Sequence, residues 1–312
     1  MSNNTAAYAE YTIQADDGTD IFVRRWLPAG GIRAAVQISH GMVEHSGRYE
    51  WFANKLAEQG FAVYAHDHRG HGKTAKTAGS LGYLADKNGF DRVVNDVRCC
   101  IEQIRTAYPD AKVILFGHSF GSFVAQRYME QYGNTIDGCI LSGTAGPRLA
   151  LVRTARVIAA AAKVIGGPKK CSRFINALAF GSSCSRIQDK RTRSDWLSRD
   201  SAQVDAYIAD PLCQFTPTSS FFYDLFDGLC TIHTKEQMRR IPVSLPIFLF
   251  AGTADPVGSY GKTVQVLYDV YRNNGVSDLE LKLYPGARHE LLNEINREEA
   301  LADILSWLNK RF

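Results

Sequence analysis

Residues 113–122, with the sequence VILFGHSFGS, constrain the fold more than any other stretch of this chain. The first four residues are apolar and mostly β-favouring, which predicts a short strand buried on both faces. Residues 117–121 then fit the pattern G-x-S-x-G, and Phe123, Val124 and Tyr128 recur at helical spacing after it. The stretch therefore predicts a buried parallel strand, a tight turn and a helix.

The turn at Ser119 needs small neighbours. Gly117 and Gly121 stand two residues before and two residues after the serine, where larger side chains would clash. The serine is then left on a strained elbow with its hydroxyl exposed, near the amino end of a helix whose dipole favours a developing oxyanion. Ser119 is therefore the candidate nucleophile.

Strand-like and helix-like patterns alternate along most of the chain. Two β-like runs around the turn signal at residues 16–18 predict an opening hairpin, and six later runs predict further strands. Strands that alternate with helices imply an α/β fold, with a mostly parallel sheet and helices on both of its faces. The expected strands cover residues 8–14, 19–27, 34–39, 61–65, 113–116, 136–141, 246–251 and 279–284.

The alternation breaks between about residues 144 and 234. This break indicates an insertion across the carboxyl edge of the sheet, where open α/β sheets place their sites. We therefore expect a first part of the core at residues 1–143, an inserted lid at residues 144–240 and a second part of the core at residues 241–312.

A serine hydroxyl is a poor nucleophile until a base takes its proton, and another group must hold that base in the right tautomer. His289 follows an expected strand, in the loop YPGARHE at residues 284–290. Asp255 likewise follows an expected strand, in GTADP at residues 252–256. The chain order Ser119, Asp255, His289 is the order of an α/β-hydrolase triad, so these residues are the expected catalytic set.

The tetrahedral intermediate of such a reaction also needs backbone donors. One should be the N–H of Phe120, directly after the nucleophile. The other should come from the loop after the third expected strand, where Met42 lies in the sequence HGM. Met42 and Phe120 are therefore the expected oxyanion hole.

Four motifs together resemble the monoacylglycerol lipase and lysophospholipase family of serine α/β-hydrolases, over a span from about residue 11 to the carboxyl terminus. Phe120 stands where this family usually has Met. The resemblance implies an α/β-hydrolase fold with an eight-stranded sheet and a helical lid. It also implies hydrolysis of single-chain lipid esters through an acyl-enzyme, without a cofactor or a metal. The motifs are residues 40–49 (HGMVEHSGRY), 67–72 (DHRGHG), 117–121 (GHSFG) and 286–294 (GARHELLNE).

The composition favours a cytoplasmic globular protein. At 312 residues and 45% hydrophobic content, the chain can bury a full core. Seven cysteines without a C-x-x-C pattern suit reduced thiols rather than a disulfide framework. Residues 1–21 are polar and do not resemble a signal peptide, and no apolar stretch reaches the roughly 18 residues that a membrane span needs.

The net charge of +4 conceals an asymmetry within the expected lid. Residues 148–199 hold twelve Lys and Arg against two Asp, a net charge of +10, so the remainder of the chain carries −6. Residues 149–165 are nearly all apolar apart from Thr154 and a narrow stripe formed by Arg153, Arg156 and Lys163, which predicts an amphipathic helix. Such a helix could make transient contact with a membrane surface, which would make the protein peripheral, or it could pack on the lid with a solvated basic edge. No nucleic-acid motif accompanies the charge, so nucleic acid is not an expected partner.

Other functions fit parts of the sequence. Residues 66–71 (HDHRGH) approach the pattern of dinuclear zinc hydrolases, but Gly70 stands where a metal-binding Asp is needed. Residues 289–293 likewise lack the second histidine of H-E-x-x-H. On the same fold, an esterase for short or medium-chain esters, an aminopeptidase or a ligand-binding protein with little turnover remain alternatives. The sequence leaves the headgroup, the acyl chain length and the oligomeric state open.

Overall fold

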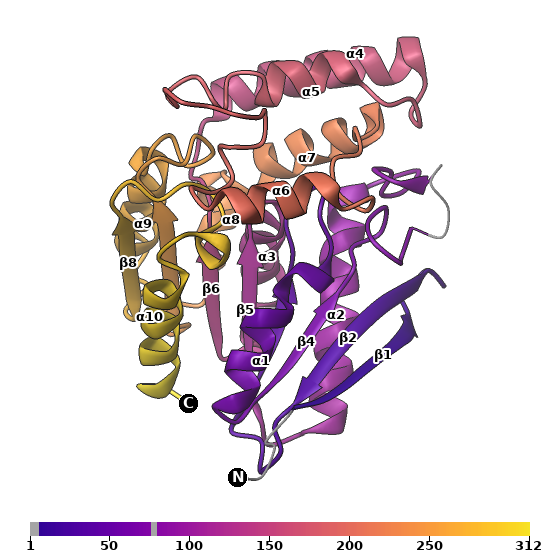
Figure 1. The fold of residues 1–312 in the computed structure, drawn as a ribbon. Helices are drawn as coiled ribbons and strands as arrows, with labels where there is room; N and C mark the ends of the chain where they lie inside the picture. The colour runs from indigo at the N-terminus through magenta and orange to yellow at the C-terminus, as the bar shows by residue number, and fades with distance from the viewer. Residues whose placement is uncertain (1–5, 76–79) are drawn as a thin grey trace.

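Eight strands form one sheet with the order β1-β2-β4-β3-β5-β6-β7-β8 in the computed structural model, which describes residues 6–75 and 80–312 (Figure 1). The first five residues of the polar amino terminus discussed above lie outside these ranges. β1 and β2 run antiparallel to their neighbours and all later pairs are parallel, as the sequence predicts. The strands are β1 (Ala7–Gln14), β2 (Asp20–Leu27), β3 (Ala34–Ser39), β4 (Phe61–His66), β5 (Lys112–His118), β6 (Gly138–Ser142), β7 (Ile247–Gly252) and β8 (Leu279–Tyr284).

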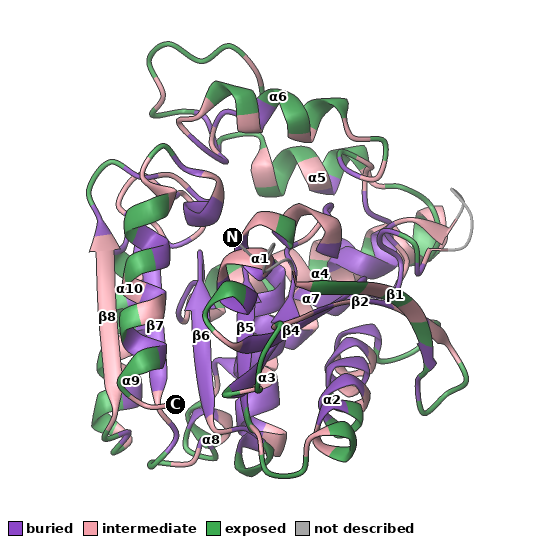
Figure 2. Cartoon of the chain, turned by 60° about the horizontal axis from the view of Figure 1, so that its bottom comes forward, coloured by how far each residue is buried: buried purple, intermediate pink, exposed green. Residues whose placement is uncertain are grey.

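The central strands are buried along their length because their sequences are apolar on both faces. Every residue of β3, β4, β6 and β7 is buried, and β5 is buried after Lys112 (Figure 2). Continuous apolar runs of this kind are typical of parallel strands covered by helices on both sides. The prediction of an α/β fold with a mostly parallel sheet is confirmed.

Helices cover both faces of this sheet. One hydrophobic cluster joins the sheet to α2, α3 and α9, and a second joins it to α1 and α10. The second face also carries short 3-10 turns, of which η1 begins directly after the loop that follows β3. The bounds are α1 (Glu50–Glu58), α2 (Gly89–Ala107), α3 (Phe120–Tyr132), α9 (Lys262–Asn273), α10 (Arg297–Asn309), η1 (Ser46–Tyr49) and η4 (Leu291–Asn293).

Four of the five helices between β6 and β7, α4 to α7, lie over the carboxyl edge of the sheet, and the short α8 lies beside α3 before the chain enters β7 (Figures 1 and 2). The helix expected at residues 149–165 is α4, which packs against α7 and forms the outermost layer together with α5. Leu225 and Phe221 of α7 are buried in the core cluster on the α2 and α3 side, so this segment packs directly on the sheet domain. The bounds are α4 (Leu149–Gly166), α5 (Arg173–Phe180), α6 (Ser201–Ala209), α7 (Ser219–Ile232) and α8 (Lys235–Met238).

The register brings the carboxyl ends of the central strands side by side. Ser39 of β3 pairs with Gly117 of β5, and His118 pairs with Ser142 of β6. The loops that follow these strands therefore meet at one edge, beneath the inserted helices. All seven cysteines are free thiols. Within residues 6–75 and 80–312, no helix has the length and apolar character of a membrane span.

Candidate active site

Ser119 occupies the sharp turn between β5 and α3, with φ of +52° and ψ of −117°. A non-glycine residue with this φ is strained, which is typical of a residue held for a function. Both neighbouring glycines are required by packing. A Cβ on Gly117 would lie 2.5 Å from the Gly121 carbonyl oxygen, and a Cβ on Gly121 would overlap the Ser39 carbonyl oxygen. The sequence pattern thus produces the predicted strand, turn and helix.

Asp255 and His289 come together at the same edge of the sheet. Asp255 follows β7, His289 follows β8, and both side chains are buried. The Nδ1 of His289 donates a hydrogen bond to Oδ2 of Asp255 over 2.9 Å, and Oδ1 of Asp255 accepts one from the Val257 N–H at 2.8 Å. With Nδ1 as the donor, Nε2 of the neutral ring is left as a proton acceptor.

The surroundings of His289 set its basicity. Burial alone would lower the pKa of His289, but the Asp255 carboxylate raises that pKa above its ordinary value. The ring of His118 lies 4.8 Å from that of His289, and burial lowers the pKa of His118 to about 3, so His118 stays uncharged at neutral pH. The indole of Trp196 also packs against His289, with 4.8 Å between the ring centroids. His289 is therefore the basic histidine of this pair.

Ser119 and His289 line one cavity of about 1090 Å³. Within the described residues the Ser119 hydroxyl has no hydrogen-bond partner, so the structure brings the hydroxyl and the imidazole to one cavity without joining them directly. Catalytic hydrogen bonds of this kind are often long in the absence of substrate. The Asp255–His289 half of the expected triad is formed, and Ser119 faces the same space.

The loop after β3 lies against the serine. The position at which Gly41 would carry a Cβ is 3.3 Å from Cβ of Ser119, and both Met42 and Phe120 line the cavity. In the described part of the chain, neither the Met42 nor the Phe120 N–H donates to a loop or side-chain acceptor. Both predicted donors are therefore available at the cavity that holds the serine.

Arg48 joins the two loops of the site, a feature that the sequence analysis missed. Its Nη1 donates to Glu44 Oε2 and to Glu290 Oε1, each at 2.7 Å, and its Nη2 donates to Glu290 Oε2 at 2.6 Å. Glu44 in turn accepts from the Gly41 N–H, next to Met42, while Glu290 directly follows His289. One guanidinium thus connects residues 40–45, the expected oxyanion loop, to residues 285–290, the histidine loop. The motifs at residues 40–49 and 286–294 contain all three charged residues, but sequence alone does not pair them.

The loop between α5 and α6 is fixed to the histidine loop. Arg288 Nη1 donates to the carbonyl oxygens of Asp195 and Ser198, at 2.6 and 2.8 Å, and the Glu290 N–H donates to the Leu197 carbonyl at 2.7 Å. Residues 195–198 are therefore a fixed wall beside His289.

Apolar side chains form a large part of the lining of the cavity that holds Ser119. Such a lining suits an acyl chain better than a polar substrate, because burying apolar surface is favourable without specific partners. Polar and cationic side chains from α5 and from the loop that follows it share the same cavity. The apolar lining residues are Met42, Val43, Phe120, Phe123, Ala177, Phe180, Trp196, Leu197, Phe215, Leu225 and Val257.

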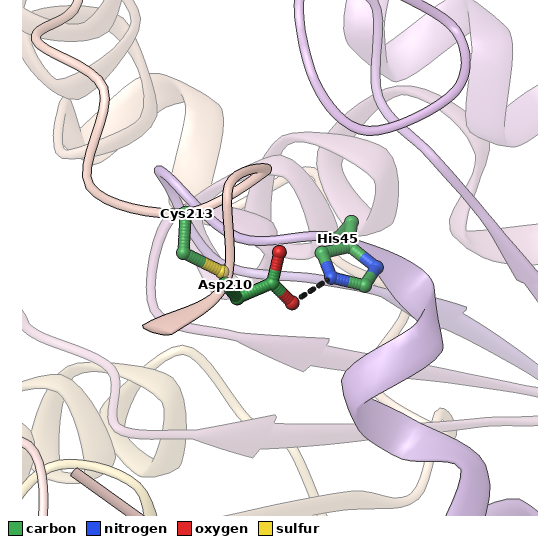
Figure 3. A group of neighbouring side chains, drawn as sticks. All are labelled: His45, Asp210 and Cys213. Carbon is green, nitrogen blue, oxygen red and sulfur yellow. Dashed lines mark hydrogen bonds and ion pairs between the residues drawn. The ribbon is translucent and has the colours of Figure 1, made fainter. Parts of the chain in front are cut away.

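His45, Asp210 and Cys213 form the group of side chains in the described ranges that most resembles a metal site (Figure 3). The imidazole already has other partners, because Nδ1 of His45 accepts from the Gly47 N–H at 3.2 Å and Nε2 donates to Asp210 Oδ2 at 2.8 Å. A metal at Nε2 would require that proton to leave, and burial raises the pKa of the Cys213 thiol, which opposes a thiolate. The bond from His45 to Asp210 instead ties η1 to the loop after α6.

Most polar side-chain atoms of residues 66–71, considered above as a metal motif, have internal hydrogen-bond partners, whereas the buried Nε2 of His71 has none among the described residues. His66 Nδ1 bonds the Gln37 amide at 2.9 Å, and its Nε2 bonds Nδ1 of His68 at 3.0 Å. Oδ1 of Asp67 accepts from the Ser46 N–H at 2.8 Å and from Arg24 at 3.2 Å. Burial lowers the pKa of His66 to about 4. These residues lie beneath the expected oxyanion loop and support it.

Known proteins resemble the chain over nearly its whole length. The family described as serine aminopeptidase S33 matches residues 30–296. The monoglyceride lipase of Mus musculus is 30% identical over 301 residues, covering 95% of this chain and 88% of the relative. The monoacylglycerol lipase of Mycolicibacterium smegmatis is 29% identical, covering 96% of each chain.

Solved structures show the same likeness. A thermostable carboxyl esterase from Bacillus coagulans, determined in complex with glycerol, superposes with a TM-score of 0.91 at 32% identity. That superposition covers 98% of this chain and 99% of the esterase. A lipase described as an open form gives a TM-score of 0.88 at 28% identity, covering 97% and 99% of the two chains.

Proposed function

The chain belongs to the serine aminopeptidase S33 family, whose match spans residues 30–296, and we propose that it hydrolyses carboxylic esters of single-chain lipids with Ser119 as its nucleophile. The observation that carries this proposal is the buried His289–Asp255 hydrogen bond of 2.9 Å, at a largely apolar cavity that Ser119 also lines. The likeness to monoglyceride lipases and to a carboxyl esterase supports an ester as the substrate.

The proposed reaction has two halves. The Ser119 oxygen attacks the ester carbonyl carbon while Nε2 of His289 takes the hydroxyl proton, and the carbonyl oxygen becomes an oxyanion held by the N–H groups of Met42 and Phe120. The imidazolium, stabilised by Asp255, gives its proton to the leaving alcohol as the carbon–oxygen bond breaks. A water then attacks the acyl-enzyme, His289 takes the water's proton, and the fatty acid leaves as the proton returns to Ser119.

We assign the helices over the site to a cap, residues 144–240, inserted between core parts 1–143 and 241–312. The assignment is supported by the position of α4–α8 between adjacent strands β6 and β7. α7 packs in the core cluster, and the loop at residues 195–198 bonds the histidine loop, so these two parts of the cap form the wall of the acyl site.

The outer cap helices provide the membrane contact in this proposal. Arg153 lies exposed on α4, whereas Arg156 pairs with Asp227 of α7 at 2.7 Å and Lys163 lies over the Tyr223 ring. Single exposed apolar residues are ordinary, but six large ones on two adjoining helices favour insertion into an interface. These side chains are 56% to 86% exposed and comprise Leu151, Val157, Val164, Ile165, Phe174 and Leu178.

Ser119→Ala tests the nucleophile directly. The variant should lose p-nitrophenyl ester hydrolysis and labelling by a fluorophosphonate, while its circular dichroism stays that of the wild type. Ser122→Ala is the matched control, because the Ser122 hydroxyl lies one helical turn further along α3 and bonds the Ser119 carbonyl and Thr144 rather than lining the cavity. Labelling of Ser122→Ala should persist. A Ser119→Ala protein that keeps most of its esterase rate contradicts the assignment.

An esterase for short chains is the second candidate, favoured by the high TM-score to the Bacillus coagulans carboxyl esterase. A series of p-nitrophenyl esters from acetate to laurate separates the two. Rising kcat/KM with chain length supports the lipid ester hydrolase, because each methylene buried in the cavity contributes about 0.8 kcal/mol. A maximum at acetate supports the short-chain esterase.

Sedimentation with lipid vesicles tests the membrane contact. We expect wild-type protein to co-sediment with vesicles containing anionic phosphatidylglycerol, and Val164→Glu with Ile165→Glu to reduce the bound fraction. Val266→Glu is the control, since Val266 is 44% exposed on α9, outside the cap. An equal loss of binding in the control, or none in the double variant, argues against these helices as the contact.

A further inference from the structure

Four cationic residues line the same cavity as Ser119. They are Arg173 at the start of α5 and Lys190, Arg191 and Arg193 in the loop that follows this helix. These cations are not scattered over the surface, because all four line the cavity that Ser119 also lines.

Most of this positive charge is not neutralised. Arg191 pairs with Asp205 at 2.9 Å, but within the described ranges Arg173, Lys190 and Arg193 have no ion-pair partner. The acidic residues that line the cavity are Glu44 and Glu290, and Arg48 pairs with both. The cavity therefore carries an excess of unpaired cations.

The loop that carries three of these cations is ordered by internal hydrogen bonds. The buried Asp195 accepts from the Arg191 N–H at 2.6 Å and from both the N–H and the hydroxyl of Thr192. The Cys184 thiol donates to the Arg193 carbonyl at 3.4 Å. The chain then continues directly into Trp196, which packs on His289. The backbone that carries these cations is thus held in a fixed relation to His289.

The facing wall is one side of α5. Arg173, Asn176, Ala177 and Phe180 line the cavity at the spacing of a single helix face, while Phe174 and Leu178 point to solvent. One helix face therefore combines an apolar end with a cation and an amide. This combination fits a ligand that is part hydrocarbon and part anion.

We propose that Arg173, Lys190 and Arg193 bind the phosphate of a lysophospholipid-type substrate while its acyl ester reaches Ser119. The proposal rests on the ester hydrolysis at Ser119 proposed above and selects an anionic headgroup over a neutral glycerol. Guanidinium groups match phosphate oxygens through paired N–H donors, and Lys adds a compact charge. The acyl chain would occupy the apolar lining.

Two soluble esters test the subsite without a lipid surface. We would measure kcat/KM for 1-hexanoylglycerol and for 1-hexanoylglycerol 3-phosphate, both below their critical micelle concentrations. The readout is the ratio of the phosphate ester to the neutral ester, which cancels any general loss of activity. In Lys190→Gln with Arg193→Gln this ratio should fall at least about fivefold, the effect of weakening exposed ion pairs to the phosphate.

Lys170→Gln with Arg239→Gln is the matched control. Both residues are exposed cap cations outside the cavity lining, so this variant makes the same change in net charge and should keep the wild-type ratio. The wild-type ratio should also fall when salt rises from about 0.1 M to about 1 M, because the Debye length shortens from about 10 Å to about 3 Å.

The outcomes separate this proposal from the function on which it rests. Wild-type protein that hydrolyses neither ester defeats the proposed ester hydrolase. Protein that hydrolyses the neutral ester, but whose ratio is unchanged in the Lys190 and Arg193 variant, overturns the phosphate subsite alone. An equal fall in the control variant also overturns it, because the effect would then come from the general charge of the cap.

Discussion

Replacing Arg48 with Met tests the bridge between the oxyanion loop and the histidine loop. The side chains of Arg48, Glu44 and Glu290 are only 11%, 4% and 7% exposed, so the substitution leaves two buried carboxylates without their cation. Removing one partner of a buried ion pair costs about 3 to 5 kcal/mol. With a urea m-value of about 3 kcal/mol per M, the unfolding midpoint should fall by roughly 1 to 1.7 M.

The pH dependence of this loss gives a sharper test. In the wild type, burial alone would raise the pKa of Glu290, but Arg48 lowers it well below its ordinary value. Glu290 therefore adds stability above the ordinary carboxyl pKa, and this stability is lost as pH falls through the lowered value. Without Arg48, the largest influence that lowers the pKa of Glu290 is gone and burial is no longer offset by it, so this pKa should rise. The charged form of Glu290 should then destabilise the fold instead of stabilising it. The variant's deficit should then be largest at about pH 7 and shrink at about pH 4.

Urea denaturation followed by circular dichroism at these two pH values measures the effect. Arg98→Met is the matched control, because Arg98 and Glu102 form an ion pair at 48% and 57% exposure, which is worth about 0.5 kcal/mol or less. The reasoning is refuted if the urea midpoint of Arg48→Met falls no further than that of Arg98→Met. It is also refuted if the loss of stability in Arg48→Met grows toward acid pH.

Three further predictions concern the elbow and the histidine. Asp255→Asn should lower kcat about 10⁴-fold with little loss of fold, since an amide no longer fixes the His289 tautomer, and steady-state kinetics with circular dichroism check this. Because Asp255 raises the pKa of His289, the acid limb of the kcat/KM profile should have its midpoint above 6.5, since activity requires the neutral ring and is lost as pH falls. Gly121→Ala should abolish soluble expression or lower the Tm sharply, because its Cβ would overlap the Ser39 carbonyl, whereas Gly30→Ala has open space around it and should be tolerated.

Local rules were enough to predict the sheet and the positions of the candidate triad. The central strands are short apolar runs between turn signals, and Ser119, Asp255 and His289 each follow an expected strand. The elbow is the most local feature, because the clashes that require Gly117 and Gly121 involve backbone atoms within a few residues or on the adjacent strand. Parallel strands place their carboxyl ends at one edge, so the convergence followed from topology rather than from side-chain contacts.

Side-chain pairs between distant parts of the chain could not be predicted from the sequence. Arg48 and Glu290 are 242 positions apart, and nothing in either motif selects one as the partner of the other. The partners of the basic stripe expected on residues 149–165 could not be predicted either. The helix was predicted correctly, but Arg156 faces Asp227 and Lys163 faces Tyr223 on α7, so two of its three cations are already engaged. Periodicity identifies a helix face but not the element that this face meets.

The attachments of the cap are unevenly distributed, and this distribution constrains how a lipid can enter. Residues 195–198 and the segment around α6 are bound to the catalytic loops through Arg288, His45 and the Tyr207 hydroxyl, which donates to the Val43 carbonyl at 3.2 Å. Moving that half would disturb the loops that hold His289 and Met42. α4 and α5 instead expose apolar side chains. α4 packs on α7, and Ile175 of α5 joins a small buried cluster with Ala159 of α4 and Phe222 of α7. Entry of an acyl chain that leaves the catalytic loops in place must therefore occur on the α5 side, where Arg173 and Phe180 already line the cavity.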